Sequence, residues 1–128
     1  MSHRILIVDD SKTVRLAIRQ TLSEAGYEVI EAETGTMALE LAKKERLDLI
    51  LLDLELPGLN GFEVLRFLKG MPAVKEVPVL AITGIFERLE DIHRLKTLGA
   101  AGYIRKDTAP GELVFRVRHA LTLPEPSS

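Results

Sequence analysis

Short apolar runs, rich in β-branched residues, alternate along the chain with longer segments. The runs lie at residues 4–9, 28–32, 48–53, 77–82 and 102–105. Runs of this kind favour strands, and the segments between them are long enough to form helices. The alternation therefore predicts consecutive βαβ units that place five strands in one parallel sheet.

The longer segments carry apolar residues at the spacing of one helical face. A first helix is predicted to end at Gly26, because glycine is suited to a helix terminus. Its inward face comprises Val14, Ala17, Ile18, Thr21, Leu22 and Ala25. Thr34 or Thr36 can cap a second helix, and a third is predicted from about residue 61 to residue 69.

A fourth and a fifth helix complete the pattern. The fourth ends before Gly99, and the fifth begins near Pro110, since proline is favoured in the first helical turn. The inward faces comprise Leu89, Ile92 and Leu95 in the fourth helix, and Leu113, Val114, Val117 and Leu121 in the fifth. Phe115 falls on the opposite side of the fifth helix, so it is expected at the surface. There it is either part of an interface or an isolated apolar residue.

The runs at residues 5–8 and 49–52 are continuously apolar, which is typical of strands covered on both faces. We therefore expect these two strands at the centre of the sheet, with helices on both sides. The fold class is α/β, a doubly wound three-layer sandwich whose strand order is 2-1-3-4-5.

Polar side chains gather where these strands end. The first strand runs into Asp9 and Asp10, and the third ends in Asp53. In the order 2-1-3-4-5 the two strands are neighbours, so the three carboxylates converge at the edge where open α/β sheets bind ligands. Thr83 and Lys106, at the ends of the fourth and fifth strands, add a hydroxyl and an ammonium group to the same edge.

Composition and charge narrow the choice of function. The chain has 128 residues, 46% of them hydrophobic and 28% charged, as expected for one globular domain. A formal net charge of −2 gives no basis for direct nucleic acid binding. The absence of cysteine excludes disulfides, thiolate zinc sites and cysteine nucleophiles. His3, His93 and His119 have no metal-binding spacing.

The apolar runs also bear on location. None approaches the length of a membrane-spanning helix, and the first strand begins too early for a signal peptide to precede it. We therefore expect a cytoplasmic protein that does not bind membranes.

These motifs, in this order, resemble the receiver domain of two-component response regulators, including regulators of the chemotaxis type. They are Asp9-Asp10, Asp53 followed by Pro57, Gly58 and Gly61, Thr83-Gly84, and the Tyr103-Ile104-Arg105-Lys106 segment. The resemblance extends from residue 4 to about residue 121. It implies a flavodoxin-like (βα)5 receiver domain over residues 1–121. The linker-like composition of the end of the chain predicts a flexible tail or linker remnant over residues 122–128.

The resemblance implies a phosphoryl and metal site. Asp53 would accept a phosphoryl group from a histidine kinase or a histidine phosphotransfer protein. Asp10, Asp53 and the backbone carbonyl of Glu55 would bind Mg²⁺ directly, and Asp9 would act largely through water. This oxygen-rich set suits Mg²⁺, which prefers hard oxygen ligands and keeps several waters.

The same resemblance implies a conformational switch. Thr83 and Lys106 would bind the phosphoryl oxygens, and Tyr103 would be the aromatic residue that changes position on activation. The surface formed by the fourth helix, the fifth strand and the fifth helix would then control an output domain or a homodimer. The domain would be a regulatory phosphoacceptor and not an enzyme, although it would assist its own phosphoryl transfer and autodephosphorylation.

Other interpretations apply to the same residues. Taken singly, Asp10 and Ser11 can be helix caps and Lys106 a surface lysine, but their convergence on one edge with Asp53 favours a joint site. A flavodoxin-type or P-loop enzyme would need a glycine-rich phosphate loop that the chain lacks. A phosphatase of the haloacid dehalogenase type would need aspartate where Glu55 stands. The remaining alternative is a degenerate receiver that acts as a phosphorylation-independent protein-interaction module.

One position departs from the family pattern. In many receivers proline follows the active-site lysine and their peptide bond is cis, whereas here Asp107 follows Lys106. A cis bond before a residue other than proline costs about 2.5–4 kcal/mol. We therefore predict a trans Lys106–Asp107 bond, with Asp107 or Thr108 available to cap the fifth helix.

Overall fold

The computed structural model describes residues 2–84 and 89–122 of the chain. Its elements, in order, are β1 (Arg4–Val8), α1 (Lys12–Glu24), β2 (Glu28–Ala32), α2 (Gly35–Lys44), β3 (Leu49–Asp53), α3 (Gly61–Gly70), β4 (Val79–Thr83), α4 (Leu89–Thr97), β5 (Gly102–Arg105) and α5 (Pro110–Thr122). The strands form one parallel sheet in the order β2-β1-β3-β4-β5, which confirms the predicted topology.

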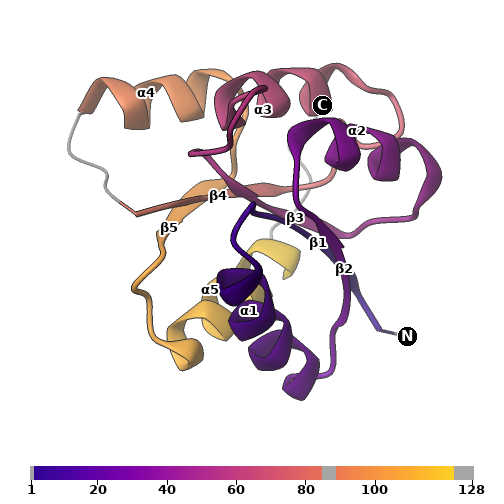
Figure 1. The fold of residues 1–128 in the computed structure, drawn as a ribbon, viewed down its shortest axis with the longest axis vertical. Coiled ribbons are helices and arrows are strands. Elements are labelled where there is room, and N and C mark those ends of the chain that lie inside the picture. The colour runs from indigo at the N-terminus through magenta and orange to yellow at the C-terminus, as the bar shows by residue number, and fades with distance from the viewer. Residues whose placement is uncertain (1, 85–88, 123–128) are drawn as a thin grey trace.

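The helices cover both faces of the sheet (Figure 1). Helices α1 and α5 lie on one face, and α2, α3 and α4 lie on the other. Each face has its own core. One core joins the sheet to Leu22 of α1 and to Leu113 and Val117 of α5, and the other joins it to α2, α3 and Leu95 of α4. The predicted three-layer sandwich is therefore confirmed.

Strands β1 and β3, whose sequences are continuously apolar, both lie in the interior of the sheet, as expected. Residues 5–8 of β1 and 49–52 of β3 are all 0% exposed. Strand β4 begins at Val79, two residues later than predicted. Pro78 lacks the N–H that a central strand needs, and the N–H of Val77 donates to the Val74 carbonyl in the preceding turn.

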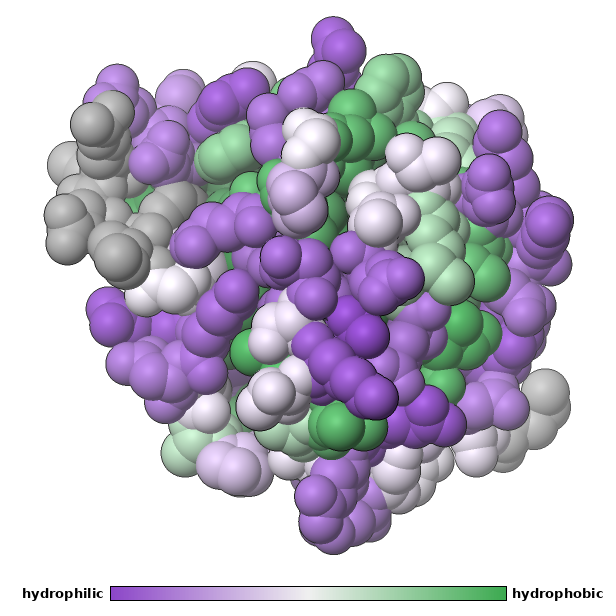
Figure 2. Space-filling view, viewed as in Figure 1, coloured by the Kyte–Doolittle hydropathy of each residue, from purple (hydrophilic) through white to green (hydrophobic). Residues whose placement is uncertain are grey.

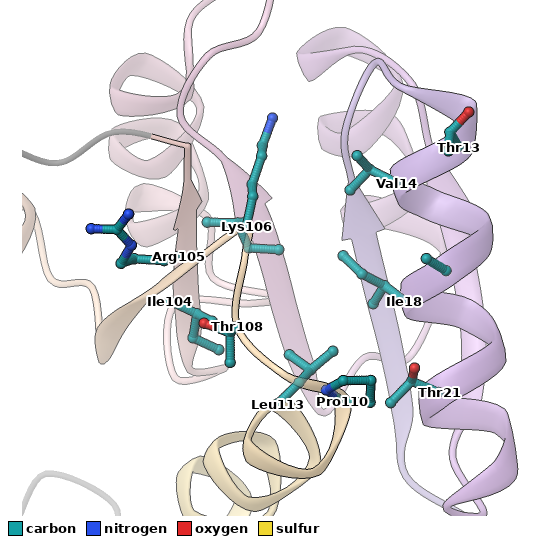
Figure 3. Close-up of a pocket in the computed structure, with 12 residues that line it drawn as sticks. Thr13, Val14, Ile18, Thr21, Ile104, Arg105, Lys106, Thr108, Pro110 and Leu113 are labelled. Carbon is teal, nitrogen blue, oxygen red and sulfur yellow. The ribbon is translucent and has the colours of Figure 1, made fainter.

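Helix α1 is less covered than its periodicity predicted. Ser11 caps it, since the Ser11 hydroxyl accepts a hydrogen bond from the Val14 N–H. Leu22 is buried, but Ala17 and Ala25 are exposed. A pocket of about 220 Å³ lies between part of α1 and α5 (Figure 3). Ala17 is one of the residues that line it. The predicted inward position of Ala17 therefore faces open space instead of the neighbouring helix.

The other helices follow the sequence pattern with small differences. Thr34 caps α2, and α5 buries Ala120 in addition to Leu113 and Val117, while Val114 and Leu121 are half-buried. The side chain of Leu89 and the tail residues 123–128 lie outside the described part of the chain.

The surface is largely hydrophilic in the view of Figure 2, with apolar side chains showing between polar ones. Phe115 is 64% exposed, as its position on α5 predicted, and its ring stacks on that of His119. Among the described helices none is long and apolar enough to cross a membrane.

Residues 2–84 and 89–122 contain no cis peptide bond. The bond between Lys106 and Asp107 is therefore trans, as predicted. The Asp107 carboxylate accepts hydrogen bonds from the Arg105 guanidinium.

Candidate functional site

The predicted carboxylates meet at the carboxyl edge of the sheet. Asp9 directly follows β1, Asp10 follows Asp9, and Asp53 is the last residue of β3. One carboxylate oxygen from each of the three residues lies within 4.8 Å of the other two. Asp9 and Asp53 are fully buried, whereas Asp10 is exposed. The parallel pairing of β1 with β3 thus brings together acids from distant parts of the sequence.

The turn that carries Asp9 is held by several hydrogen bonds. The Asp9 N–H donates to the Ala32 carbonyl at 3.1 Å, and Asp9 Oδ1 accepts from the Ser11 N–H at 2.8 Å. The Arg15 guanidinium of α1 donates to the Asp9 carbonyl at 2.6 Å. These bonds fix the turn between β1 and α1 and leave Asp9 Oδ2 directed into the site.

Arg15 is itself positioned by an ion pair that sequence reasoning missed. Its Nε lies 3.0 Å from Glu31 Oε1, and Arg19 lies 2.6 Å from Glu31 Oε2. Burial alone would raise the pKa of Glu31, but the bonds from Arg19 and Arg15 lower that pKa below its ordinary value. The spacing of Arg15 and Arg19 on α1 was visible in the sequence, but nothing there identified Glu31 of β2 as their shared partner.

Lys106 reaches Asp53 across the edge of the sheet. Its Nζ donates to Asp53 Oδ2 at 3.1 Å and lies 3.7 Å from Asp9 Oδ2. In Figure 3 its side chain runs past the pocket between α1 and α5, with the ammonium pointing away from Pro110 and Leu113. Burial alone would lower the pKa of Lys106, but the hydrogen bond and the negative charge of Asp53 raise that pKa overall.

The Asp9 carboxylate is buried beside two other acidic side chains, Asp10 and Asp53. Its Oδ2 is buried and has no hydrogen-bond partner within residues 2–84 and 89–122. Burial raises the pKa of Asp9, and the charges of Asp53 and Asp10 raise it further, against the opposing effects of the Ser11 N–H and of Lys106. A buried anionic oxygen directed toward two other carboxylates is a suitable ligand for a hard divalent cation.

Glu55 and Thr83 lie at the same carboxyl edge of the sheet as the three aspartates. The Glu55 N–H donates to Asp53 Oδ1 at 2.9 Å, which orients the Asp53 carboxylate. The Glu55 side chain accepts from the Gly84 N–H at 3.1 Å and from the Thr83 hydroxyl at 3.5 Å. The sequence had assigned a role only to the backbone carbonyl of Glu55, and it gave no signal that the carboxylate would lie against Gly84.

The loop from β3 to α3 folds back tightly against Asp53. A Cβ at Gly61 would lie 2.5 Å from the Asp53 carbonyl oxygen and would collide with the Leu54 backbone. Gly58 adopts a positive φ of 72°, a conformation that favours glycine. Asn60 then caps α3 by accepting from the Glu63 N–H. Glycines in this loop therefore allow α3 to begin directly beside the acidic cluster.

Tyr103 lies on β5, which β4 separates from the strand that ends in Asp53. Its side chain is half-buried and packs against the core shared with α2, α3 and α4. Its carbonyl accepts a hydrogen bond from Arg116 of α5 at 2.7 Å. Tyr103 is thus attached to two elements of the face predicted to transmit a signal.

Residues 5–118 match the family model described as the response regulator receiver domain. The chain belongs to this family, whose members are regulatory phosphoacceptors of two-component signalling, not classical enzymes. Receiver domains of this kind bind Mg²⁺ at an acidic pocket and interact with histidine kinases or phosphotransfer proteins.

Individual relatives agree with this assignment. The chain is 34% identical to sporulation initiation phosphotransferase F of Bacillus subtilis, with 96% of this chain and 97% of that protein covered. It is similar to the chemotaxis protein CheY4 of Vibrio cholerae at 32% identity and a TM-score of 0.89, covering 94% and 99% of the two chains.

A third similar structure is the receiver domain of the sensor histidine kinase PA1611 from Pseudomonas aeruginosa. It has 25% identity and a TM-score of 0.87, with 96% of this chain and 100% of that chain covered. That structure holds a magnesium ion in its active-site cleft.

Proposed function

We propose that the chain accepts a phosphoryl group on Asp53 from a phosphohistidine of a kinase or phosphotransfer protein. The observation that carries the proposal is the Asp53 carboxylate, fully buried yet bonded to Lys106 at 3.1 Å and placed beside two further acids. An Asp53 oxygen would form the new O–P bond while the N–P bond of the donor breaks, and the histidine nitrogen would keep the electron pair of that bond. Lys106 would neutralise charge on the transferred group.

A magnesium ion fits the acidic cluster. Asp10, Asp53 and the Glu55 carbonyl would hold it directly, and Asp9 would act largely through water. Mg²⁺ would supply positive charge at the phosphoryl oxygens, where charge neutralisation is the main requirement of the reaction. The buried Oδ2 of Asp9, which has no hydrogen-bond partner among the described residues, supports this assignment, and so does the magnesium ion in the receiver domain of PA1611. The same groups would assist the later hydrolysis of the aspartyl phosphate.

Intact-mass measurement after brief incubation with acetyl phosphate tests this function. The wild-type chain should gain one phosphoryl group, and chelation of Mg²⁺ should suppress the gain. Asp53→Asn should abolish it, whereas Asp48→Asn, a change of the same kind before β3, should leave it intact. Phosphorylation of Asp53→Asn at the wild-type rate would refute the assignment. A wild-type chain that never gains the group would favour the alternative of a phosphorylation-independent interaction module.

We further propose that the output is transmitted through α4, β5 and α5. Phosphoryl oxygens bonded to the Thr83 hydroxyl would draw the end of β4 toward Asp53, and Tyr103 would respond because β5 pairs with β4. Arg116 would carry the change to α5 through its bond to the Tyr103 carbonyl. The exposed Phe115 on α5 gives this face an apolar group for an output domain or for a second copy of the chain.

Thr83→Ala tests the switch separately from phosphorylation. Beryllofluoride, which stands in for the phosphoryl group, should shift the amide resonances around Tyr103 strongly in the wild type and weakly in Thr83→Ala. Thr36→Ala, a matched change at an exposed position on α2, should behave like the wild type. Equal shifts in wild type and Thr83→Ala would contradict the proposed route.

A further inference from the structure

The Glu55 side chain makes an unusual approach to the end of β4. Glu55 is exposed, and such a glutamate ordinarily extends into water. Here its Oε1 instead accepts from the Gly84 N–H at 3.1 Å and lies 3.5 Å from the Thr83 hydroxyl. A Cβ at Gly84 would lie 3.5 Å from Glu55 Oε1, an ordinary van der Waals distance, so the Glu55 carboxylate packs directly against this residue.

The two donors that hold Glu55 lie beside the phosphoacceptor. Thr83 is the hydroxyl expected to bind a phosphoryl oxygen, and the Gly84 N–H is the next donor along the chain. A carboxylate oxygen and a phosphoryl oxygen are both anionic acceptors, and a hydroxyl or an amide N–H has only one hydrogen to donate. One anionic oxygen must therefore leave these donors before the other can bind them.

We propose that the Glu55 carboxylate is an internal occupant of the phosphoryl-oxygen site, bound to Thr83 and Gly84 until a phosphoryl group displaces it. The proposal rests on the proposed function of Asp53. It gives Glu55 a regulatory role in its side chain that is separate from the expected metal ligand in its backbone carbonyl. The unphosphorylated protein thereby keeps the end of β4 in a bonded conformation that phosphorylation must exchange for another.

The occupancy of this bonded conformation sets the size of the effect. If Glu55 holds the donors in roughly 90% of the molecules, only about a tenth can bind a phosphoryl mimic without a rearrangement, and the apparent affinity falls about tenfold. Removal of the side chain in Glu55→Ala should therefore tighten beryllofluoride binding by about tenfold at fixed Mg²⁺.

Simple charge repulsion between Glu55 and the phosphoryl group must be separated from occupancy of the donors. Glu55→Asp keeps the charge but shortens the side chain by one methylene, so it loses its reach to Gly84. Glu55→Gln keeps the length and an acceptor oxygen but loses the charge. If Glu55 occupies the donors, Glu55→Asp should bind beryllofluoride as tightly as Glu55→Ala, and Glu55→Gln should have an affinity between those of Glu55→Ala and the wild type. If Glu55 acts only by charge repulsion, Glu55→Gln should have the beryllofluoride affinity of Glu55→Ala, and Glu55→Asp should have that of the wild type.

The experiment is a beryllofluoride titration followed by amide resonances, with Glu33→Gln as a control for loss of an exposed acid elsewhere. Before any beryllofluoride is added, Glu55→Ala and Glu55→Asp should shift the Gly84 amide resonance, because its acceptor is gone. Both variants should then bind about tenfold more tightly than wild type and Glu33→Gln. An unmoved Gly84 resonance, or an Asp variant that binds like the wild type, would overturn the proposal. Beryllofluoride that binds Asp53→Asn as well as the wild type would instead overturn the function of Asp53, on which the proposal rests.

Discussion

Replacing Asp9 with asparagine removes one charge from the acidic cluster while keeping its shape. The Asp9 carboxylate is fully buried, and its Oδ2 has no hydrogen-bond partner among the described residues. Asparagine keeps an oxygen that can accept from the Ser11 N–H and places an amide group where Oδ2 lay. That amide can donate to Asp53. We therefore expect Asp9→Asn to be more stable than the wild type when no divalent cation is present.

The size of the gain follows from three opposing contributions. At an effective dielectric constant of about 20, unit charges on Asp9 and Asp53, which lie no more than 4.8 Å apart, repel by at least about 3.5 kcal/mol. The attraction of Asp9 to Lys106 at 3.7 Å is about 4.5 kcal/mol on the same basis. These two nearly cancel, and what remains is the cost of an unsatisfied buried oxygen, about 1–3 kcal/mol. A gain of about 1–2 kcal/mol corresponds to roughly 3–8 °C in Tm for a chain of this size.

Thermal melts at neutral pH, one with chelator and one with Mg²⁺, measure the stability of the metal-free protein and the stability that Mg²⁺ adds. In the wild type, Mg²⁺ at about ten times its Kd should add about 1.4 kcal/mol of stability. Asp9→Asn should lose most of that increment.

Asp48→Asn serves as a control variant that should lose stability, where Asp9→Asn should gain it. Burial alone would raise the pKa of Asp48, but hydrogen bonds from the Arg4 N–H and from Arg46 lower it. Its removal should therefore destabilise the protein equally with and without Mg²⁺. An Asp9→Asn variant that melts below the wild type in chelator would refute the electrostatic argument.

Two further predictions concern stability. Because the bonds from Arg19 and Arg15 hold the pKa of Glu31 below its ordinary 4.5, the folded state loses this stabilisation as the pH falls from about 4.5 through that lowered pKa. Glu31→Gln should accordingly cost about 0.5–1.5 kcal/mol at pH 7 in urea unfolding, and the difference should shrink as the pH falls below about 4.5. Gly61→Ala should cost about 1–3 kcal/mol because its Cβ meets the backbone of Leu54, whereas Gly70→Ala, in open space at the end of the same helix, should cost nothing. A Gly61→Ala protein as stable as Gly70→Ala would show that the loop after β3 can relax.

The sheet was predictable because its signal is local and repeated. Continuous apolar runs such as residues 5–8 identified the central strands, and each acid at a strand end then had only one edge on which to lie. The convergence of Asp9, Asp53 and Lys106 therefore followed from topology alone. Topology could not decide whether Asp10 or Ser11 caps α1, because either residue type suits that position; in the structure the cap is Ser11.

The parts that sequence reasoning missed depend on long side chains and on gaps between elements. The periodicity of α1 predicted that Ala17 faces inward, but it could not show that α5 leaves a pocket at that position. The hydrogen bond from the Gly84 N–H to the Glu55 carboxylate joins the ends of β4 and β3, and no sequence pattern encodes the direction of a flexible glutamate side chain. The same holds for Arg15 and Glu31, whose pairing needs the docked positions of α1 and β2.

The pairing of β1 with β3 has a kinetic consequence for any ion held at its end. Asp9 and Asp53 are separated by two helices and a strand along the chain, so a cation shared by both would close a long loop. Opening the sheet between these strands would then require release of the ion first. Slow hydrogen exchange of the central strands should depend on ion concentration, and the lifetime of the folded chain would follow the magnesium supply around it.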